Sequence, residues 1–267
     1  MAQHHAMEWE HVKVEGDGTI RHLVFNRPKI HNAVNAQLLR DVISACRAIN
    51  EMPDCRAVIV RGAGPSFSSG ADLKEPSFRE GNLRAMQHRA RLGADAVNAI
   101  GDLYPVTVAA VHGYAIGGGA CLAMACDFQI GAASCQVSIR EANLGRSLSW
   151  NSIPNTVHLV GPKRAKHMII FGEMYAAKTL LEWGFFDEVV PDEQLLEAAL
   201  AFAERVARQP PIPVQMTKAS INALVKTFNR SVFHMDDLGV TYSSRTQDAR
   251  AAEEAFFSGA KPDWRVE

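Results

Sequence analysis

Short apolar segments alternate with segments of helical spacing along the first part of the chain, and this alternation limits the fold more than any other feature. Four segments are short, apolar or alternating, and bounded by turn residues, which predicts buried strands. They are Trp9–Val14, Ile20–Phe25, Ala57–Arg61 and Val106–Val111. Helices are expected over Ala36–Glu51, capped by Asn35, and over Arg84–Ile100. The alternation predicts an α/β fold with parallel strand pairing.

The last part of the chain has a different pattern. Helices are predicted over Leu195–Arg208, Val214–Val225 and Thr246–Ser258, with no convincing strand between them. Pro210, Pro211 and Pro213 separate the first two, because proline lacks an N–H and disfavours helix at the preceding residue. We therefore expect an α/β core over residues 1–195 and a helical region over residues 196–267. The pattern leaves open whether that region packs on a neighbouring subunit or on its own core.

Charge and cysteine content exclude several classes of protein. The 267 residues include 28 basic and 29 acidic side chains, a net charge of −1, so broad attraction to nucleic acid or anionic membranes is not indicated. The five cysteines form no CxxC or Cys/His ligand spacing, which argues against a disulfide framework and a metal site. The chain shows no apolar run of signal-peptide or membrane-span length. We expect a cytoplasmic protein without nucleic-acid, membrane or metal partners.

Two glycine-rich turns, Arg61–Glu75 and His112–Asp127, each follow a predicted strand directly. Glycine permits close backbone approach, and a helix that begins after Gly117–Gly119 presents free N–H groups. Two such turns can point two amides at one oxygen atom, which is the geometry of an oxyanion hole. The alternative is a pair of tight turns that serve packing alone. Neither turn has the GxGxxG spacing of a dinucleotide site or the GK[ST] of a phosphate loop.

Four motifs occur in an order that is more specific than any one of them. They are NRPKIHNA (Asn26–Ala33), GPSFSSGADLKE (Gly64–Glu75), GYAIGGGACLAMACD (Gly113–Asp127) and AAKTLLEWGFFDEVVPDEQL (Ala176–Leu195). With these motifs the chain resembles the crotonase superfamily, the enoyl-CoA hydratase/isomerase group, from about Trp9 to the C-terminal helix.

The resemblance implies an α/β spiral of ββα repeats with a C-terminal helical trimerisation region. It implies a homotrimer or a dimer of trimers, and acyl-CoA thioesters as substrates. Coenzyme A is then part of the substrate, and no separate cofactor is expected. The shared chemistry of the group is the stabilisation of a thioester enolate, whose negative charge collects on the thioester oxygen.

Carried over by position, the resemblance places the two oxyanion amides at Ala71 and Gly118. It places the path of coenzyme A along four consecutive residues: Ser69, Gly70, Ala71 and Asp72. Lys74 is expected to reach a phosphate of coenzyme A or, alternatively, to be a solvated lysine. For Asp72 a structural hydrogen-bonding role is favoured over that of a base.

The acid/base residues depart from the family pattern. Hydratases of this group use two glutamates, and this chain has Cys121 in place of the first and Glu141 at the second. The resemblance therefore makes Glu141 the catalytic acid/base. Cys121 is interpreted as a small buried residue, with a reactive thiolate as the alternative. Arg140 either lowers the pKa of Glu141 or points to the other face.

A second departure lies in Arg146–Thr156, where flexible glycines of the family are replaced. Trp150 is expected either to form an aromatic wall of the acyl pocket or to pack in the core. Ser147, Ser149 and Asn151 are candidates to position a water molecule in place of the missing glutamate.

The leading interpretation is an acyl-CoA-processing enzyme of the enoyl-CoA hydratase/isomerase type, with Glu141 as general acid/base. The alternatives are a CoA-thioester hydrolase or C–C-cleaving relative, and a noncatalytic acyl-CoA-binding or RNA-binding homologue. The retained Glu141 and the near-neutral charge disfavour the noncatalytic alternative.

Overall fold

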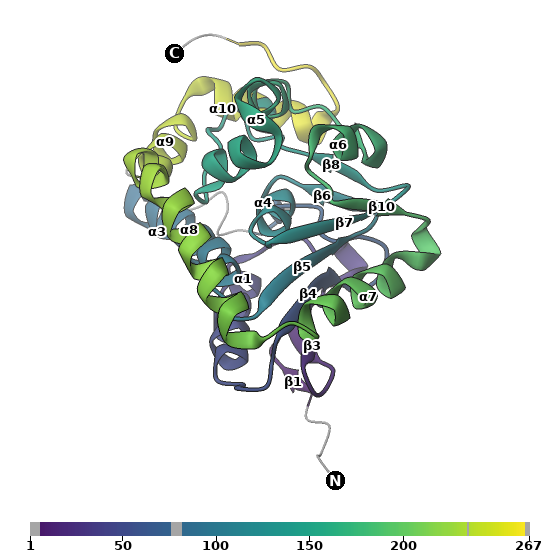
Figure 1. Ribbon diagram of the computed structural model, residues 1–267. Helices are drawn as coiled ribbons and strands as arrows, with labels where there is room; N and C mark the ends of the chain where they lie inside the picture. Colours follow the sequence, from purple (N-terminus) through teal and green to yellow (C-terminus); the bar gives the residue numbers. More distant parts are fainter. Residues whose placement is uncertain (1–5, 76–81, 234, 265–267) are drawn as a thin grey trace.

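The computed structural model describes residues 6–75, 82–233 and 235–264, and its main element is a seven-stranded sheet (Figure 1). In spatial order its strands are β1 (Met7–Glu8), β2 (Val12–Glu15), β3 (Ile20–Phe25), β4 (Ala57–Gly62), β5 (Val106–Val111), β7 (Phe128–Ala132) and β10 (Glu188–Val190). The pairs from β3 to β10 are parallel, and β1, β2 and β3 pair antiparallel. The predicted α/β fold with a mainly parallel sheet is confirmed.

The centre of this sheet is apolar on both faces. All six residues of β5 are buried, as expected for a parallel strand covered on two sides. The strands predicted at Ile20–Phe25 and Val106–Val111 have the predicted bounds, and the strand predicted at Trp9–Val14 begins later, at Val12. A smaller sheet contains β6 (Tyr114–Ile116), β8 (Gln136–Ser138) and β9 (Tyr175–Ala176).

Helices of the core pack around the two sheets. They are α1 (Ala36–Asn50), α3 (Leu83–Gly101), α4 (Gly118–Met124), α5 (Ser152–Phe171), α6 (Ala177–Trp183) and α7 (Leu195–Ala207), with short 3-10 turns η1 (Pro28–Ile30), η2 (Ala142–Leu144) and η3 (Asp192–Gln194). Asn35 caps α1 as predicted, since its side chain accepts a hydrogen bond from the Leu38 amide at 2.8 Å. The helices α1 and α3 pack against each other, and α7 packs on β4 and β5.

Three helices end the chain: α8 (Pro211–Phe233), α9 (Asp236–Ser243) and α10 (Gln247–Ser258). The prediction of Val214–Val225 was too short, because Pro211 and Pro213 lie in the first turn of α8, where a missing N–H costs no helical bond. The helix α9 was not predicted. It packs on α3, and α10 packs on η2, so this region contacts its own core. The division of the chain between residues 195 and 196 stays a prediction.

Within the described residues, no helix has both the length and the apolar character needed to cross a membrane. The predicted cytoplasmic location stays a prediction.

Candidate active site

The two glycine-rich turns lie side by side. The Ser68 amide donates to the Tyr114 carbonyl at 2.8 Å, and the Ile116 amide donates to the Ser68 carbonyl at 3.0 Å. Gly70 has a φ of +86°, and a β carbon on it would lie 2.5 Å from the Ile116 carbonyl oxygen and 3.7 Å from the Gly118 nitrogen. Only glycine allows this conformation and this approach. Two segments nearly fifty positions apart in the sequence therefore meet at Gly70 and Gly118.

The backbone amides of Ala71 and Gly118 are directed away from their own secondary structure. The Val34 amide donates to the Gly70 carbonyl at 2.7 Å, and the Asp72 amide donates to the Val34 carbonyl at 2.9 Å. By the alternation of a parallel bridge, the Ala71 N–H points to the opposite side from Val34. Gly118 is the first residue of α4, so its N–H has no acceptor inside the helix. Both residues line one cavity of about 340 Å³.

Glu141 lines the same cavity, between β8 and η2. Its Oε2 is shielded from solvent and has no hydrogen-bond partner among the described residues. Burial raises the pKa of Glu141 to about 7, although its own backbone amide and the charge of Arg146 act in the opposite direction. A carboxyl with this pKa exchanges a proton readily near neutral pH.

Cys121 is buried in the first turn of α4 and also lines this cavity. Burial raises the pKa of its thiol well above the ordinary range, and the nearby charge of Glu141 adds to the increase. The residue is therefore a thiol and not a thiolate near neutral pH. This agrees with the interpretation as a small buried residue and disagrees with the alternative of a reactive thiolate.

Trp150 forms a wall of the cavity between α3 and α4. A β carbon on Gly93 would lie 2.0 Å from the indole Nε1, and one on Gly118 would lie 2.5 Å from the ring edge. Trp150 and Asn151 both have left-handed backbone conformations, with φ of 63° and 56°. The Asp236 carboxylate of α9 holds this turn, because it accepts the amides of Asn151, at 3.2 Å, and Trp150.

The predicted water-positioning residues do not all reach the cavity. Ser149 lines it, whereas Asn151 lines a different cavity. Ser147 is tied to the C-terminal helices, since its amide donates to the Ser243 hydroxyl at 2.9 Å. Of the three candidates, Ser149 is the one that lines the cavity of Glu141.

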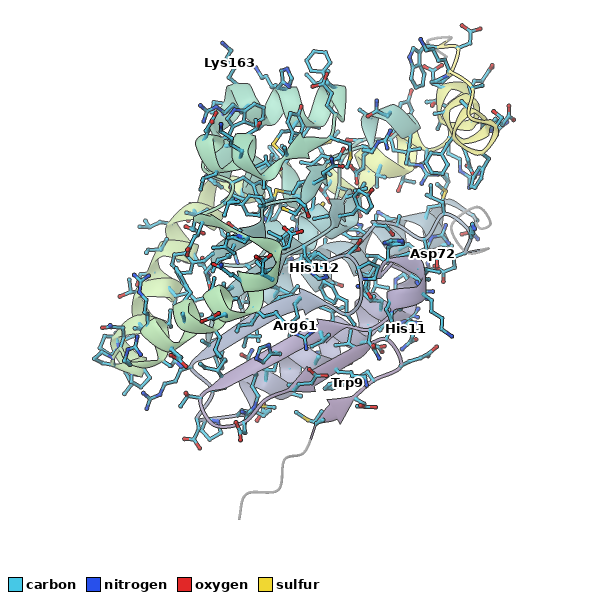
Figure 2. The ribbon with its side chains drawn as sticks, turned by 90° about the vertical axis from the view of Figure 1, so that its right-hand side faces the viewer. Trp9, His11, Arg61, Asp72, His112 and Lys163 are labelled. Atoms are coloured by element: carbon cyan, nitrogen blue, oxygen red, sulfur yellow. The ribbon has the colours of Figure 1, made fainter. Side chains whose placement is uncertain are left out.

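The remaining predicted residues lie next to the cavity lining. Figure 2 labels Asp72. This residue forms an ion pair with Arg27, with 3.1 Å between Oδ2 and Nη1, which supports a structural role for the carboxylate. The Ser69 amide donates to the His31 carbonyl at 2.8 Å, and Lys74 is exposed. The roles of Ser69, Gly70, Asp72 and Lys74 along coenzyme A stay predictions.

Of the two alternatives stated for Arg140, the structure agrees with the second. Arg140 is exposed, and the guanidinium that lowers the pKa of Glu141 belongs to Arg146. The Arg146 amide also donates to the Glu141 carbonyl at 2.9 Å, so η2 brings the two residues together. Strand alternation is not the reason for the exposure of Arg140, because β8 ends at Ser138 and Glu141 already has a helical backbone at the start of η2.

Sequence reasoning missed several residues that line this cavity. They come from α3, from the segment after η2 and from the C-terminal helices: Arg89, Arg146, Thr241, Arg245, Arg250 and Glu253. An arginine on a helix usually indicates a solvated face, and no motif marks these positions. The available signal was two pairs of arginines close in sequence, Arg140 with Arg146 around Glu141 and Arg245 with Arg250 around the start of α10.

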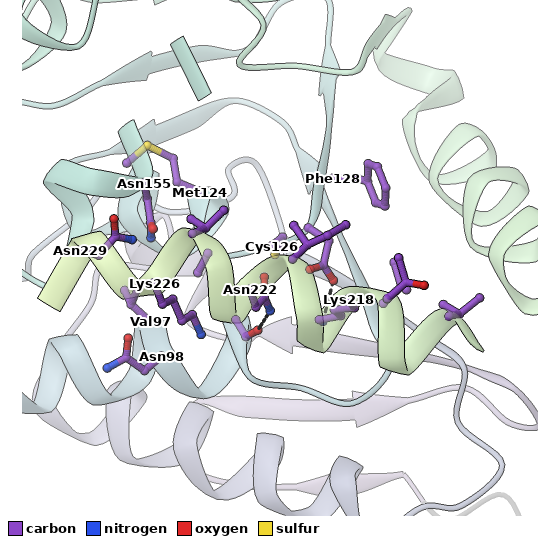
Figure 3. A pocket seen from close by; sticks show the side chains of 18 of the residues that line it. Val97, Asn98, Met124, Cys126, Phe128, Asn155, Lys218, Asn222, Lys226 and Asn229 are labelled. Carbon is purple, nitrogen blue, oxygen red and sulfur yellow. Dashed lines mark hydrogen bonds and ion pairs between the residues drawn. The ribbon is translucent and has the colours of Figure 1, made fainter. Parts of the chain in front are cut away.

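A second cavity, of about 650 Å³, lies along α8 and is larger (Figure 3). Two of its polar side chains, Lys218 and Asn222, hold that helix against the core. Lys218 forms an ion pair with Asp127 at 2.6 Å and donates to the Pro105 carbonyl at 2.8 Å, and Asn222 donates to the Gly101 carbonyl at 3.1 Å. Ala71, Gly118 and Glu141 do not line it. The smaller cavity is therefore the candidate active site.

Comparisons with known proteins agree with this fold. The sequence profile of the enoyl-CoA hydratase/isomerase family matches residues 15–267. A crotonyl-CoA hydratase of Syntrophomonas wolfei is 31% identical over 263 residues, which cover 97% of this chain and 99% of that protein. A short-chain-enoyl-CoA hydratase of Clostridium acetobutylicum is 29% identical and covers 96% of this chain and 97% of its own length.

Solved structures show the same architecture. An enoyl-CoA hydratase from Bacillus anthracis superposes with a TM-score of 0.77 at 28% identity, covering 97% of this chain and 100% of that one. One from Mycobacterium avium subsp. paratuberculosis has a TM-score of 0.85 at 22% identity, with coverage of 96% and 98%, and shows the fold alone. The crotonase-like α/β fold expected from the motifs is thus confirmed, and the chain belongs to the enoyl-CoA hydratase/isomerase family of the crotonase superfamily.

Proposed function

We propose that this enoyl-CoA hydratase/isomerase-type enzyme stabilises a thioester enolate with the amides of Ala71 and Gly118, and that Glu141 moves the proton. The observation that carries the proposal is the buried Glu141 carboxyl, with a pKa of about 7, in the cavity that both amides line. An amide that points into a water-poor site stabilises developing negative charge at no cost of reorganisation.

The reaction that these residues supply without a further group is migration of a double bond. Glu141 takes a proton from the α carbon of a 3-enoyl thioester, and the electron pair moves onto the thioester oxygen between the two amides. The protonated Glu141 then gives the proton to the γ carbon, the double bond forms between the α and β carbons, and the enolate collapses. One carboxyl serves both transfers, which fits a site with Cys121 in place of a second glutamate.

Water addition is the second candidate, and the observation that favours it is the position of Ser149 in the cavity lining. A hydroxyl there is able to orient a water molecule that Glu141 activates. The relatives named above as hydratases support the same chemistry.

The test compares the wild-type protein with Glu141→Gln on 2-enoyl-CoA and 3-enoyl-CoA esters in heavy water, with products read by mass spectrometry. We expect Glu141→Gln to lose at least about 100-fold in turnover and to keep its thioester affinity. Glu182→Gln on α6 is the matched control, because Glu182 is exposed and does not line the cavity.

Each product distinguishes one reaction from another. Double-bond migration with deuterium exchange indicates the isomerase, and an added deuteroxyl group indicates the hydratase. Release of free coenzyme A indicates a thioester hydrolase and contradicts the proposal. Unchanged turnover in Glu141→Gln contradicts the role of this residue.

The assembly into trimers or dimers of trimers is also a proposal. It is supported by large apolar side chains that the C-terminal helices expose, among them Ile212, Met216, Ile221, Leu224 and Leu238. Light scattering on the purified protein is expected to give three or six times the chain mass of 29.2 kDa.

A further inference from the structure

Among the residues that the structure describes, four arginines line the candidate active site: Arg89, Arg146, Arg245 and Arg250. The carboxylates in this described part of the lining are Glu75, Glu141 and Glu253. With a pKa of about 7, Glu141 carries only part of its charge near neutral pH. The cavity of a thioester enzyme therefore has an excess of positive charge, which attracts an anionic ligand.

Arg89 and Arg146 line the same cavity from different elements, α3 and the segment after η2. The side chain of Arg146 is only 16% exposed, and 3.8 Å separates its Nη2 from Oε2 of Glu253. Burial lowers the pKa of Arg146, and the positive charge of Arg89 contributes to the decrease, while Glu253 and Glu141 oppose it. Burial also lowers the pKa of Arg89, against the charge of Glu75.

Two guanidinium groups in the lining of one cavity repel each other, and an anion between them removes that repulsion. The planar fork of a guanidinium matches a carboxylate in particular, because two parallel N–H bonds form.

A hydroxyl in the same lining points independently to a polar ligand. Oγ1 of Thr241, on α9, is shielded from solvent and has no hydrogen-bond partner among the described residues. A buried hydroxyl without a partner is costly, and it is one more donor for a bound anion.

Trp150 limits the size of the group that the cavity accepts. Its indole occupies the space between Gly93 and Gly118, where a β carbon on either glycine would lie within 2.5 Å of the ring. When the thioester oxygen lies near Gly118, the acyl chain meets this ring. A short acyl chain therefore fits better than a long one.

We propose that the acyl group of the substrate is short and carries a second carboxylate, which Arg89, Arg146 and Thr241 bind. The inference rests on the proposed function, since it concerns the acyl end of the same site. The phosphates of coenzyme A are anions too, so the experiment must distinguish the two sources of negative charge.

The probes are two matched thioesters. One is the 4-carboxybut-2-enoyl ester, and the other is the 5-methylhex-2-enoyl ester, in which an isopropyl group replaces the carboxylate. Each is prepared on coenzyme A and on N-acetylcysteamine, which has no phosphate. We expect the wild-type protein to favour the carboxylate ester by about 10-fold or more in kcat/KM on both carriers, because a charged hydrogen-bonded contact is worth that much.

Arg89→Gln is expected to lower kcat/KM for the carboxylate ester about 10- to 100-fold and to leave the isopropyl ester within about threefold. Arg89→Lys should restore part of the loss, since the charge returns without the planar fork. Arg84→Gln, an exposed position on the same helix that does not line the cavity, is the matched control.

Two outcomes overturn the inference. An equal loss for both coenzyme A esters, with no loss for the N-acetylcysteamine esters, assigns Arg89 to a phosphate of coenzyme A. An equal or higher kcat/KM of the wild-type protein for the isopropyl ester contradicts the inference that the acyl group of the substrate carries a carboxylate.

A binding experiment distinguishes this inference from the proposed function. The saturated 4-carboxybutanoyl and 5-methylhexanoyl esters of coenzyme A are titrated by calorimetry into the wild-type protein and Arg89→Gln. Tighter binding of the carboxylate ester that depends on Arg89 supports the inference even where neither enoyl ester reacts. Turnover confined to the isopropyl ester supports the proposed function and contradicts the inference.

Discussion

The carboxyl of Glu141 occupies the space beside Gly117: a β carbon on Gly117 would lie 2.8 Å from Oε1 of the glutamate. Gly117 has a φ of +50° and a ψ of −118°, a conformation that a side chain disfavours. Glycine at this position therefore allows the backbone conformation of the turn before α4, and it leaves room for the carboxyl of Glu141.

Gly117→Ala is expected to lose most of its turnover and to be destabilised by about 1–3 kcal/mol, because it adds backbone strain and displaces the carboxyl. The measurements are urea unfolding and kcat/KM. Gly18→Ala is the matched control, since Gly18 also has a positive φ, of +60°, and a β carbon there meets nothing within 4 Å. Normal turnover in Gly117→Ala would contradict the placement of the Glu141 carboxyl.

The pH dependence of the reaction should follow Glu141. As the base, this residue acts when deprotonated, and burial raises its pKa to about 7. We expect kcat/KM for proton abstraction to rise about tenfold per pH unit below this value and to level off above it. A rate that stays constant down to pH 5 would show that another group takes the proton.

The stability of Glu141→Gln should also depend on pH. The pKa of Glu141 rises from an ordinary value of 4.5 to about 7 on folding, so the folded protein holds the proton more tightly than the unfolded chain. The contribution to stability is complete below about pH 4.5 and is lost as the pH rises through about 7. Glutamine does not titrate, so Glu141→Gln does not lose stability in this way as the pH rises. Its free energy of unfolding relative to wild type should therefore increase by up to about 3 kcal/mol across this window, measured by urea unfolding at pH 4.5 and pH 8. A constant difference between the two proteins would mean that the carboxyl is not buried.

Gly93→Ala should reveal the contact between α3 and the indole of Trp150. Alanine normally favours a helix over glycine, but here its β carbon would lie 2.0 Å from Nε1 of Trp150. We expect destabilisation by about 1–3 kcal/mol from overpacking. In the background of Trp150→Leu the same change should become neutral or stabilising, and a double-mutant cycle by thermal unfolding measures the difference. Additive effects would place the ring elsewhere.

Cys121 should be chemically inert in the folded protein. Burial raises the pKa of its thiol well above the ordinary range, so the nucleophilic thiolate is scarce. Iodoacetamide at pH 8 is expected to leave Cys121 unmodified until urea unfolds the chain, with peptide mass spectrometry as the readout. Cys121→Ala should keep kcat/KM near the wild-type value and cost about 1 kcal/mol of stability. Rapid labelling of the native protein, together with a large loss of rate in Cys121→Ala, would identify a nucleophile.

Local patterns were enough to predict the core and the motif-bearing part of the site. The strand at Val106–Val111 and the cap at Asn35 depend on neighbours in the sequence, and both were predicted correctly. The motif positions Ala71, Gly118 and Glu141 line one cavity because the two glycine-rich turns pack together. Their catalytic roles stay predictions.

The residues that define the far side of the cavity have no local signature. Arg89 lies on a helix whose other arginines, such as Arg84, face solvent, and Thr241 lies on the short helix α9, which the pattern did not indicate. Their common property is convergence in space, which depends on how α9 packs on α3. The left-handed turn at Trp150 was equally hidden, because a tryptophan does not suggest such a conformation.

The turn at Trp150 and Asn151 also limits how segments of this protein can be exchanged with those of relatives. Asp236, 85 positions away in the sequence, holds the two left-handed residues that carry the indole. A chimera that joined roughly the first 200 residues of this protein to the last helices of a relative would keep Trp150. It would lose the Asp236 carboxylate that accepts the backbone amides of this turn. An exchange of segments between family members therefore has to transfer positions 150 and 236 together. One lies at the candidate active site, and the other lies on α9 among the C-terminal helices.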